Sequence, residues 1–196
     1  MQEDILTYRS KLKSTLLQLG PSPDAEIDQL VALFKEIRIP KKTSIIKPND
    51  KADNVYFVVH GIVRIYYVKE NKEITNWFIM ENRFFAPVYF LFTGNPNPNF
   101  YEALEDTVAI TAPYNEMEKL YRQYHSLEHI GRKLIELYYA DFLKQSYDLM
   151  FLSAEERYST FIKKSPELVN RIPLRFIASF LGITQETLSR LRSKHL

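Results

Sequence analysis

The sequence predicts an α+β protein with an N-terminal antiparallel β-barrel or jelly roll, a long helix and a C-terminal helix-turn-helix. Three observations support this fold class. Residues 37–112 alternate short β-branched and aromatic runs with clusters of turn residues, as all-β barrels do. Residues 127–152 repeat apolar side chains at helical spacing. Residues 173–192 contain two short helical patterns separated by Gly182.

Composition narrows the class of protein. A chain of 196 residues, 45% hydrophobic and 26% charged, has the balance of a globular protein of one or two domains. It has no cysteine, which excludes disulfides, thiol redox sensing and iron–sulfur clusters held by cysteine. The start is charged, and no run of about 18 apolar residues occurs. We therefore expect a cytoplasmic protein that does not enter a membrane.

The N-terminal region predicts two helices. Residues 5–19 carry a moderately amphipathic pattern that Gly20-Pro21-Ser22-Pro23 breaks. Residues 24–36 place apolar side chains at i, i+3, i+4 and i+7, which predicts a second helix. From residue 37 the period changes to two. The expected strands are residues 44–47, 54–60, 62–69, 73–80, 84–92, 100–104 and 108–112.

After Pro113 the chain is predicted to be helical, with a short helix over residues 115–125 and a long one over 127–152. The long helix either packs on its own barrel or pairs with a second copy. We favour pairing, because single helix-turn-helix modules usually bind two-fold DNA sites as dimers. Ser153 and Glu156 then form a capping box that begins another helix. The apolar stripe of the long helix comprises Ile130, Leu134, Leu137, Tyr138, Phe142, Leu149 and Leu152.

The C-terminal segment has the pattern of a helix-turn-helix. Gly182 can adopt the positive φ of a tight turn, and Thr184 is a natural N-cap for the second helix. Leu188 and Leu191 lie on the face predicted to be buried. The opposite stripe carries side chains that match base edges in the major groove, since Arg bonds guanine, Glu accepts from cytosine and Gln pairs with adenine. The predicted base-reading residues are Gln185, Glu186, Ser189 and Arg190.

Charge supports a nucleic-acid partner for this segment. Residues 163–196 hold seven basic and two acidic side chains, a net charge of +5, whereas the whole chain carries +2. A basic end on a mildly acidic body is the electrostatic footprint of a phosphate-binding module. The predicted phosphate contacts are Arg171, Arg175, Thr184, Thr187, Arg192 and Lys194.

Neither catalysis nor metal binding is expected. The only close histidine pair, His125 and His129, lacks a third ligand at a familiar spacing. A cupin-type metalloenzyme needs several histidine and carboxylate ligands on neighbouring strands, and only His60 lies in the barrel region. We therefore predict no catalytic residue, no metal and no enzymatic activity.

Three segments resemble a known family. Residues 54–64 read NVYFVVHGIVR, residues 153–158 read SAEERY, and residues 177–190 read IASFLGITQETLSR. Together they resemble the cyclic-AMP receptor/Fnr (Crp/Fnr) family of bacterial transcription regulators over residues 37–196. The resemblance implies a cyclic-nucleotide-binding-like barrel (a double-stranded β-helix or jelly roll), a dimerisation helix and a helix-turn-helix of the winged type. We expect no wing hairpin after the second helix of this sequence. The implied segments are residues 1–126, 127–152 and 153–196.

The same resemblance bears on the two candidate sites. Glu186, Ser189 and Arg190 match the family's E-x-x-S-R base-reading pattern, whereas Gln185 departs from the arginine of some members. Ala86 and Pro87 stand where the family's cyclic-nucleotide cassette has Gly and Glu.

The phosphate-binding arginine of that cassette also has no counterpart. Its position falls near Asn97, and asparagine cannot neutralise a phosphate. Arg83 could supply a charge only from the wrong side of the cassette. We therefore expect no binding of cyclic AMP and no cofactor.

The aromatic barrel interior leaves three interpretations open: a plain core, an apolar pocket for an unknown small-molecule effector, or a barrel that signals through protein contacts. The candidate effector pocket comprises Arg83, Phe85, Ala86, Pro87, Tyr89, Asn97 and Tyr101.

The leading hypothesis is a homodimeric DNA-binding transcription regulator. Its expected partners are double-stranded DNA and a second copy of the chain, with RNA polymerase as a further candidate. The alternative is a ligand-binding or protein-interaction barrel module without sequence-specific DNA binding.

Overall fold

The computed structural model describes residues 4–194, without the side chain of Lys194. The chain divides into two compact units. The first comprises the chain up to Ile65 together with Phe78–Leu137, and the second comprises Tyr66–Trp77 together with the chain from Tyr138 onward. This division differs from the three predicted segments in two places. The hairpin tip, residues 66–77, belongs with the C-terminal helices, and the long helix contributes residues to both units.

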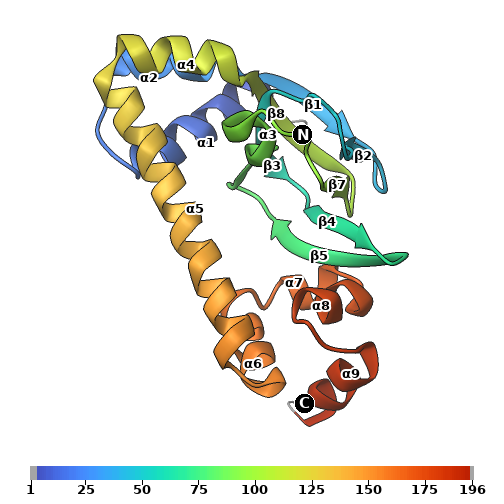
Figure 1. Ribbon diagram of the computed structural model, residues 1–196. Coiled ribbons are helices and arrows are strands. Elements are labelled where there is room, and N and C mark those ends of the chain that lie inside the picture. Colours follow the sequence, from blue (N-terminus) through green and yellow to red (C-terminus); the bar gives the residue numbers. More distant parts are fainter. Residues whose placement is uncertain (1–3, 195–196) are drawn as a thin grey trace. The chain divides into compact units, whose positions relative to one another are not determined.

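Two helices open the first unit (Figure 1). Helix α1 spans Ile5–Leu17, and the Asp4 side chain caps it by accepting the N–H groups of Leu6 and Thr7. Helix α2 spans Asp24–Ala32 and is shorter than the predicted residues 24–36. The Arg9 guanidinium explains where it ends, because it donates to the carbonyls of Ala32 and Phe34, beyond which the chain becomes a strand.

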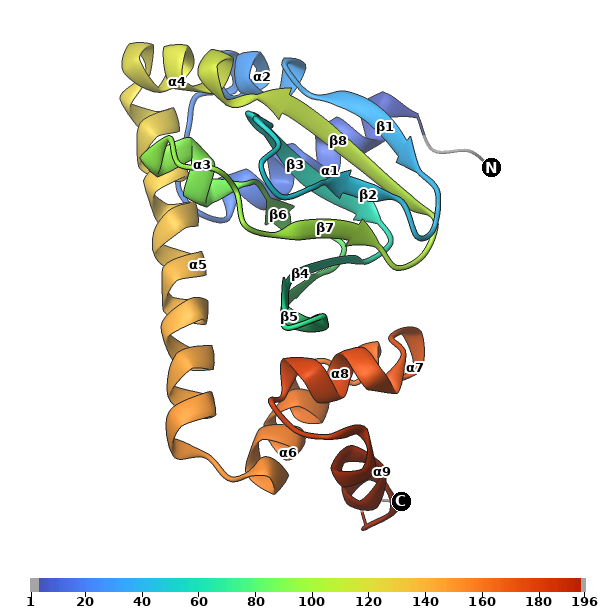
Figure 2. The ribbon, with the colours of Figure 1, turned by 45° about the vertical axis from the view of Figure 1, so that its right-hand side comes forward.

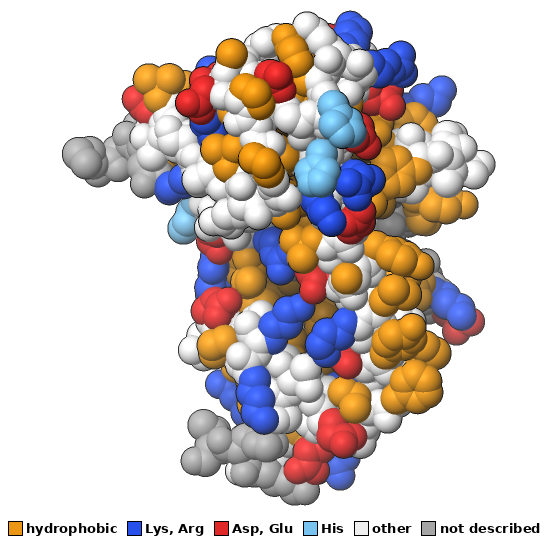
Figure 3. Space-filling view, turned by 90° about the vertical axis from the view of Figure 1, so that its left-hand side faces the viewer, with side chains coloured by type: hydrophobic (Ala, Val, Ile, Leu, Met, Phe, Trp, Pro, Cys, Tyr) orange, Lys and Arg blue, Asp and Glu red, His pale blue; other side chains and the backbone are white. Residues whose placement is uncertain are grey.

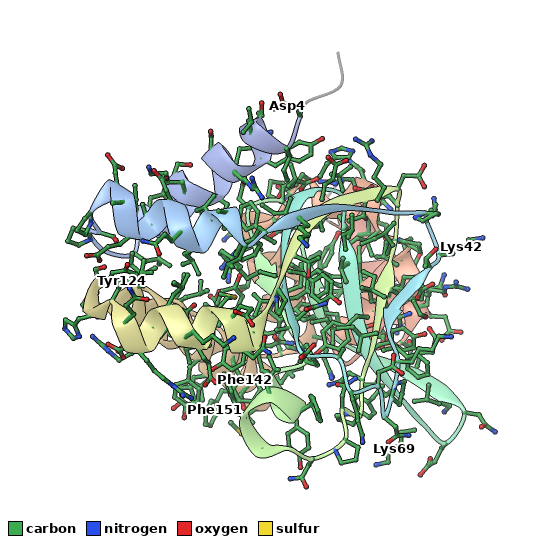
Figure 4. All side chains as sticks on the ribbon, turned by 90° about the horizontal axis from the view of Figure 1, so that it is seen from above. Asp4, Lys42, Lys69, Tyr124, Phe142 and Phe151 are labelled. Carbon is green, nitrogen blue, oxygen red and sulfur yellow. The ribbon has the colours of Figure 1, made fainter. Side chains whose placement is uncertain are left out.

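Eight strands of the described chain form two four-stranded sheets (Figure 2), which confirms the predicted α+β class with an antiparallel barrel. One sheet has the order β1-β8-β3-β6 and the other β2-β7-β4-β5. Strand β3 pairs antiparallel with both β8 and β6, and its residues 55–59 are buried. Figure 4 labels Lys42, in the turn between β1 and β2, and Lys69, at the end of β4. The strands are β1 (Lys35–Ile39), β2 (Ser44–Ile46), β3 (Asn54–His60), β4 (Val63–Lys69), β5 (Lys72–Ile79), β6 (Phe84–Phe85), β7 (Phe100–Ala103) and β8 (Thr107–Pro113).

The predicted strand over residues 84–92 is wrong for most of its length. Only β6 (Phe84–Phe85) is extended, and the chain then forms helix α3 (Val88–Thr93). Pro87 precedes this helix and has no N–H with which to continue a sheet ladder. Gly94 ends it with φ +70°, a left-handed C-cap. Aromatic side chains fit a strand and a short helix equally well, so their run did not distinguish the two.

The long helix is confirmed, but burial of its predicted apolar stripe changes along its length. Helix α4 (Tyr114–Gln123) leads into α5 (His125–Phe151). Ile130 is buried with Leu127 inside the first unit, whereas Leu137, Phe142 and Leu149 are exposed. The stripe therefore combines side chains that fill this molecule's own core with side chains that face solvent.

The second unit holds the predicted helix-turn-helix. Helix α6 (Ala154–Lys164) begins with the predicted capping box, in which the side chains of Ser153 and Glu156 each bond the other's backbone N–H. The helices that follow α6 in this unit are α7 (Leu168–Arg171), α8 (Leu174–Phe180) and α9 (Gln185–Lys194). Among the described residues, no helix combines the length and apolar character needed to cross a membrane. The buried side chains of this unit include Tyr158, Phe161, Leu168, Ile172, Phe176, Ile177, Leu181, Leu188 and Leu191.

Candidate nucleic-acid interface

The turn between α8 and α9 is built as the sequence predicts. Gly182 has φ +65°, a conformation that side-chain-bearing residues rarely adopt. Its N–H donates to the Ser179 carbonyl at 3.1 Å, and the Ile183 N–H donates to the Ala178 carbonyl at 3.0 Å. These two bonds satisfy the last carbonyls of α8, which otherwise lack helical partners.

Helix α9 begins at its predicted cap. The Thr184 hydroxyl accepts the Thr187 N–H at 3.2 Å, which confirms Thr184 as the N-cap. Leu188 and Leu191 are buried, as predicted. The hydroxyls of Thr184 and Thr187 also lie 3.1 Å apart and hydrogen-bond to each other. The two predicted phosphate-contact threonines thus meet at the start of α9.

The four predicted base-reading side chains all lie on the exposed side of α9. Gln185, Glu186, Ser189 and Arg190 are exposed, opposite the buried leucines. The Arg190 Nη2 lies 3.4 Å from the Thr187 hydroxyl. The structure therefore brings the donors and acceptors predicted from the sequence onto one solvent-facing surface.

The basic side chains predicted to bind phosphate are more dispersed. Arg171 ends the short helix α7 and is half-buried. Arg175 is exposed in the first turn of α8, with its guanidinium carbon 4.6 Å from the centre of the Phe176 ring. Arg192 is half-buried on α9, and the side chain of Lys194 lies outside the described residues.

Sequence reasoning missed one side chain that joins two elements beside this turn. Arg157 on α6 donates from Nε to the Leu181 carbonyl at 2.9 Å and from Nη1 to the Leu152 carbonyl at 2.6 Å. A single guanidinium thus joins the turn before α9 to the end of α5. Its position in the SAEERY segment marked a link into the C-terminal helices but did not identify these partners.

The barrel interior combines stacked aromatic rings with a few buried polar side chains, of which Arg64 and Asn97 are fully buried. Phe85 is buried and lies parallel to Tyr56, with ring centres 4.6 Å apart and an interplanar angle of 3°. The Tyr101 ring centre lies 5.8 Å from that of Phe85, at an interplanar angle of 27°. Tyr56 and Phe85 belong to one sheet and Tyr101 to the other, so the stack spans the space between the sheets. The Tyr101 hydroxyl donates to the Ala86 carbonyl at 3.0 Å, and burial raises the pKa of this phenol above its usual value.

Asn97, near the position where the family has its phosphate-binding arginine, bonds to its own loop and to Lys47. The side chain is fully buried. Its amide nitrogen donates to the carbonyls of Lys47 (3.2 Å) and Asn99 (2.7 Å), and its oxygen accepts the Asn99 N–H (3.2 Å). The amide donor and acceptor of Asn97 are therefore both used in bonds within the protein.

The candidate effector residues are therefore only partly brought together. Tyr101 contacts the Phe85 ring and the Ala86 backbone carbonyl, and Pro87, the next residue in the chain, is buried. Tyr89 is half-exposed on α3, and Arg83 is half-buried. No group of three or more metal-ligating side chains occurs within residues 4–194.

Comparison with known proteins supplies an independent line of evidence. The family model of the cyclic nucleotide-binding domain matches residues 36–124. The fumarate and nitrate reduction regulatory protein of Vibrio cholerae is 25% identical over 186 residues, covering 86% of this chain and 72% of that protein. The global nitrogen regulator of a Nostoc species is 34% identical over 86 residues, covering 42% of this chain and 38% of that protein.

A solved structure shares the fold. The structure of FixK2 from Bradyrhizobium japonicum superposes with a TM-score of 0.69 at 23% identity, covering 82% of this chain and 83% of that one. At that identity the likeness establishes the fold of barrel, long helix and C-terminal helices.

Proposed function

The chain belongs to the Crp/Fnr family of regulators, and we propose that it is a transcription regulator whose α9 reads the half-sites of two-fold DNA operators. The observation that carries this proposal is the exposed polar face of α9. Four side chains able to bond base edges share one surface, and the buried Leu188 and Leu191 fix the opposite face of the helix.

Each side chain of this face has a defined role in the proposal. Arg190 donates to the two acceptors of a guanine, and Glu186 accepts from the amino group of a cytosine. Ser189 and Gln185 add neighbouring contacts. Arg175 is exposed and sets the register by binding phosphate, which carries no sequence information. The proposed activity is binding and involves no catalytic step.

The second copy required for a two-fold site pairs along α5. Ile135, Tyr139, Phe142 and Leu149 are 45%, 59%, 59% and 43% exposed. They fall at i, i+4, i+7 and i+14, the spacing of a coiled-coil seam. Figure 3 faces the side on which α5 lies and shows hydrophobic side chains gathered in patches along it. Exposed apolar side chains at this spacing can bury one another when two copies of the chain pair along α5.

The barrel does not use cyclic AMP as its effector in this proposal. Phe85 stacks on Tyr56 of its own sheet and on Tyr101 of the other sheet, and the Asn97 amide bonds loop carbonyls. Ala86 and Pro87 provide no side-chain acceptor for a ribose hydroxyl. A cyclic nucleotide would have to displace the ring stack and would then find no cation in place of Asn97.

Selection of bound sequences from a random DNA pool, using the purified full chain without added ligand, tests the proposal. We expect enrichment of a two-fold motif with a G·C pair in each half. Binding to the selected DNA should keep its sequence preference as salt rises, whereas non-specific binding weakens steeply. No enrichment, with or without a metabolite extract, would instead favour a barrel module that lacks sequence-specific DNA binding.

A further inference from the structure

The tip of the β4–β5 hairpin is held by side chains of the C-terminal helices. The hairpin residues 66–77 and the helices from Tyr138 onward form one compact unit. Strand β5 stands at the end of its sheet order, so one of its edges has no neighbouring strand in the described chain. Such an edge exposes backbone N–H and C=O groups that need other partners.

Ser179 of α8 supplies those partners. Its hydroxyl accepts the Thr75 N–H at 3.0 Å and donates to the Glu73 carbonyl at 3.1 Å. Residues two apart on a strand direct their backbone groups to the same edge, so one hydroxyl bonds the edge as a neighbouring strand would. The backbone carbonyl of Ser179 also accepts the Gly182 N–H. The hairpin is thereby connected through one residue to the turn that starts α9.

Two further contacts extend this attachment to α5 and to the core of the helix-turn-helix. The Gln145 amide on α5 donates to the Asn76 carbonyl at 3.0 Å. The Trp77 ring meets Phe180 edge-on with ring centres 6.5 Å apart, and Phe180 in turn packs on Phe161 of α6. Residues 73–77 are therefore bonded to α5 on one side and to α8 on another.

We propose that residues 73–77 act as a strut that fixes the angle between α5 and the helix-turn-helix, with Ser179 and Gln145 as positioning residues for DNA recognition. The inference rests on the proposed function, because α5 carries the pairing seam and α9 the reading face. The angle between them sets the separation of the two recognition helices in a dimer. That separation determines which half-site spacing the dimer accepts.

The first test measures the strut without DNA. Ser179→Ala removes the hydroxyl, and amide hydrogen exchange at Thr75 should become about tenfold faster or more, since its N–H loses its acceptor. Ser179→Thr keeps a hydroxyl and should restore slow exchange. Ser10→Ala is the matched control, because the Ser10 hydroxyl bonds only the Leu6 carbonyl of its own helix. Trp77 is the only tryptophan, so its fluorescence should change in Ser179→Ala and stay unchanged in Ser10→Ala. Unchanged exchange and fluorescence in Ser179→Ala would overturn the strut.

The second test measures half-site spacing. The selected operator is compared with the same operator carrying one inserted central base pair. The affinity for the selected operator divided by the affinity for the operator with the insertion should fall by about tenfold in Ser179→Ala relative to wild type. Ser179→Thr should restore this ratio. Gln145→Met, which keeps the side-chain length but cannot donate to Asn76, should lower the ratio in the same direction.

An unchanged ratio in both variants would overturn the positioning role. If the wild-type chain selects no DNA, the proposed function fails and the positioning role falls with it. Faster Thr75 exchange in Ser179→Ala would still establish the contact in that case.

Discussion

The guanidinium of Arg157 donates to the carbonyl of Leu181, in the turn of the helix-turn-helix, at 2.9 Å. The same side chain also donates to Leu152, the residue that follows α5. Carbonyls at helix ends lack intrahelical partners, and here one planar cation satisfies two of them. The turn before α9 is thus bonded to the end of the long helix by a single half-buried side chain.

Replacing Arg157 should destabilise the C-terminal unit. Arg157→Ala removes two charge-assisted hydrogen bonds, and we expect a loss of about 1.5–3 kcal/mol in the free energy of unfolding. Arg157→Lys should recover little, because an ammonium lacks the planar fork that reaches both carbonyls. Urea denaturation followed by Trp77 fluorescence measures the change, since Trp77 belongs to this unit. Arg122→Ala is the control, because Arg122 is largely exposed in its ion pair with Glu118 and should change stability little. If Arg157→Ala and Arg122→Ala lower the free energy of unfolding equally, Arg157 does not stabilise the unit by bridging the two carbonyls.

Arg190 should determine base preference rather than general affinity. Arg190→Ala is expected to cost about 1–3 kcal/mol on the selected operator and to relax specificity at one base pair of each half-site. Arg175→Ala should weaken binding to all sequences similarly and reduce the salt dependence, because a phosphate contact carries no sequence information. Titration of both variants against operator and scrambled DNA separates the two roles. If Arg190→Ala loses the same affinity on both DNAs, it does not read bases.

Much of the fold could be predicted because local chemistry determined it. The capping box of Ser153 and Glu156, the left-handed Gly182 and the Thr184 cap each depend on residues within four positions of one another. The run over residues 84–92 was misassigned because a continuous apolar and aromatic run has no unique period. There the proline before α3 and the glycine after it, rather than hydrophobicity, set the structure.

The candidate site shows the same division between local and distant determinants. The polar face of α9 follows from helical periodicity alone. Ser179 contacts strand residues about a hundred positions away in the chain, and Arg157 reaches a turn 24 residues further on. No local pattern encodes such partners, so these two roles required the structure. The apolar stripe of α5 shows the same limit: Ile130 and Leu137 are seven residues apart on one face of the helix, and only the tertiary packing makes the first buried and the second exposed.

The buried Tyr101 phenol should make the barrel sensitive to alkali. Burial raises the pKa of Tyr101 in the folded protein above its unfolded value near 10. A raised folded pKa means that the stabilisation is fully present below about pH 10 and is lost as the pH rises above it, because the unfolded phenol ionises first. Tyr101→Phe removes this group, so its stability should fall less between about pH 9 and 11 than that of wild type. At neutral pH it should cost about 1 kcal/mol, the hydrogen bond to Ala86. Parallel alkaline profiles for the two proteins would contradict the assignment.

The seam on α5 makes a prediction about oligomeric state. Phe142→Lys places a charge in the middle of the proposed interface, where pairing would have to desolvate it, so the dimer should dissociate. Tyr147→Lys is a matched control on the same helix, because Tyr147 is similarly exposed but lies on a different face. Light scattering after size-exclusion chromatography, with all proteins at one concentration, should give a monomer for Phe142→Lys and a dimer for Tyr147→Lys and wild type. Persistence of the dimer in Phe142→Lys would place the interface elsewhere. A monomeric Phe142→Lys with normal unfolding should also lose binding to two-fold operators, since two reading helices joined in one dimer gain their affinity from simultaneous contact.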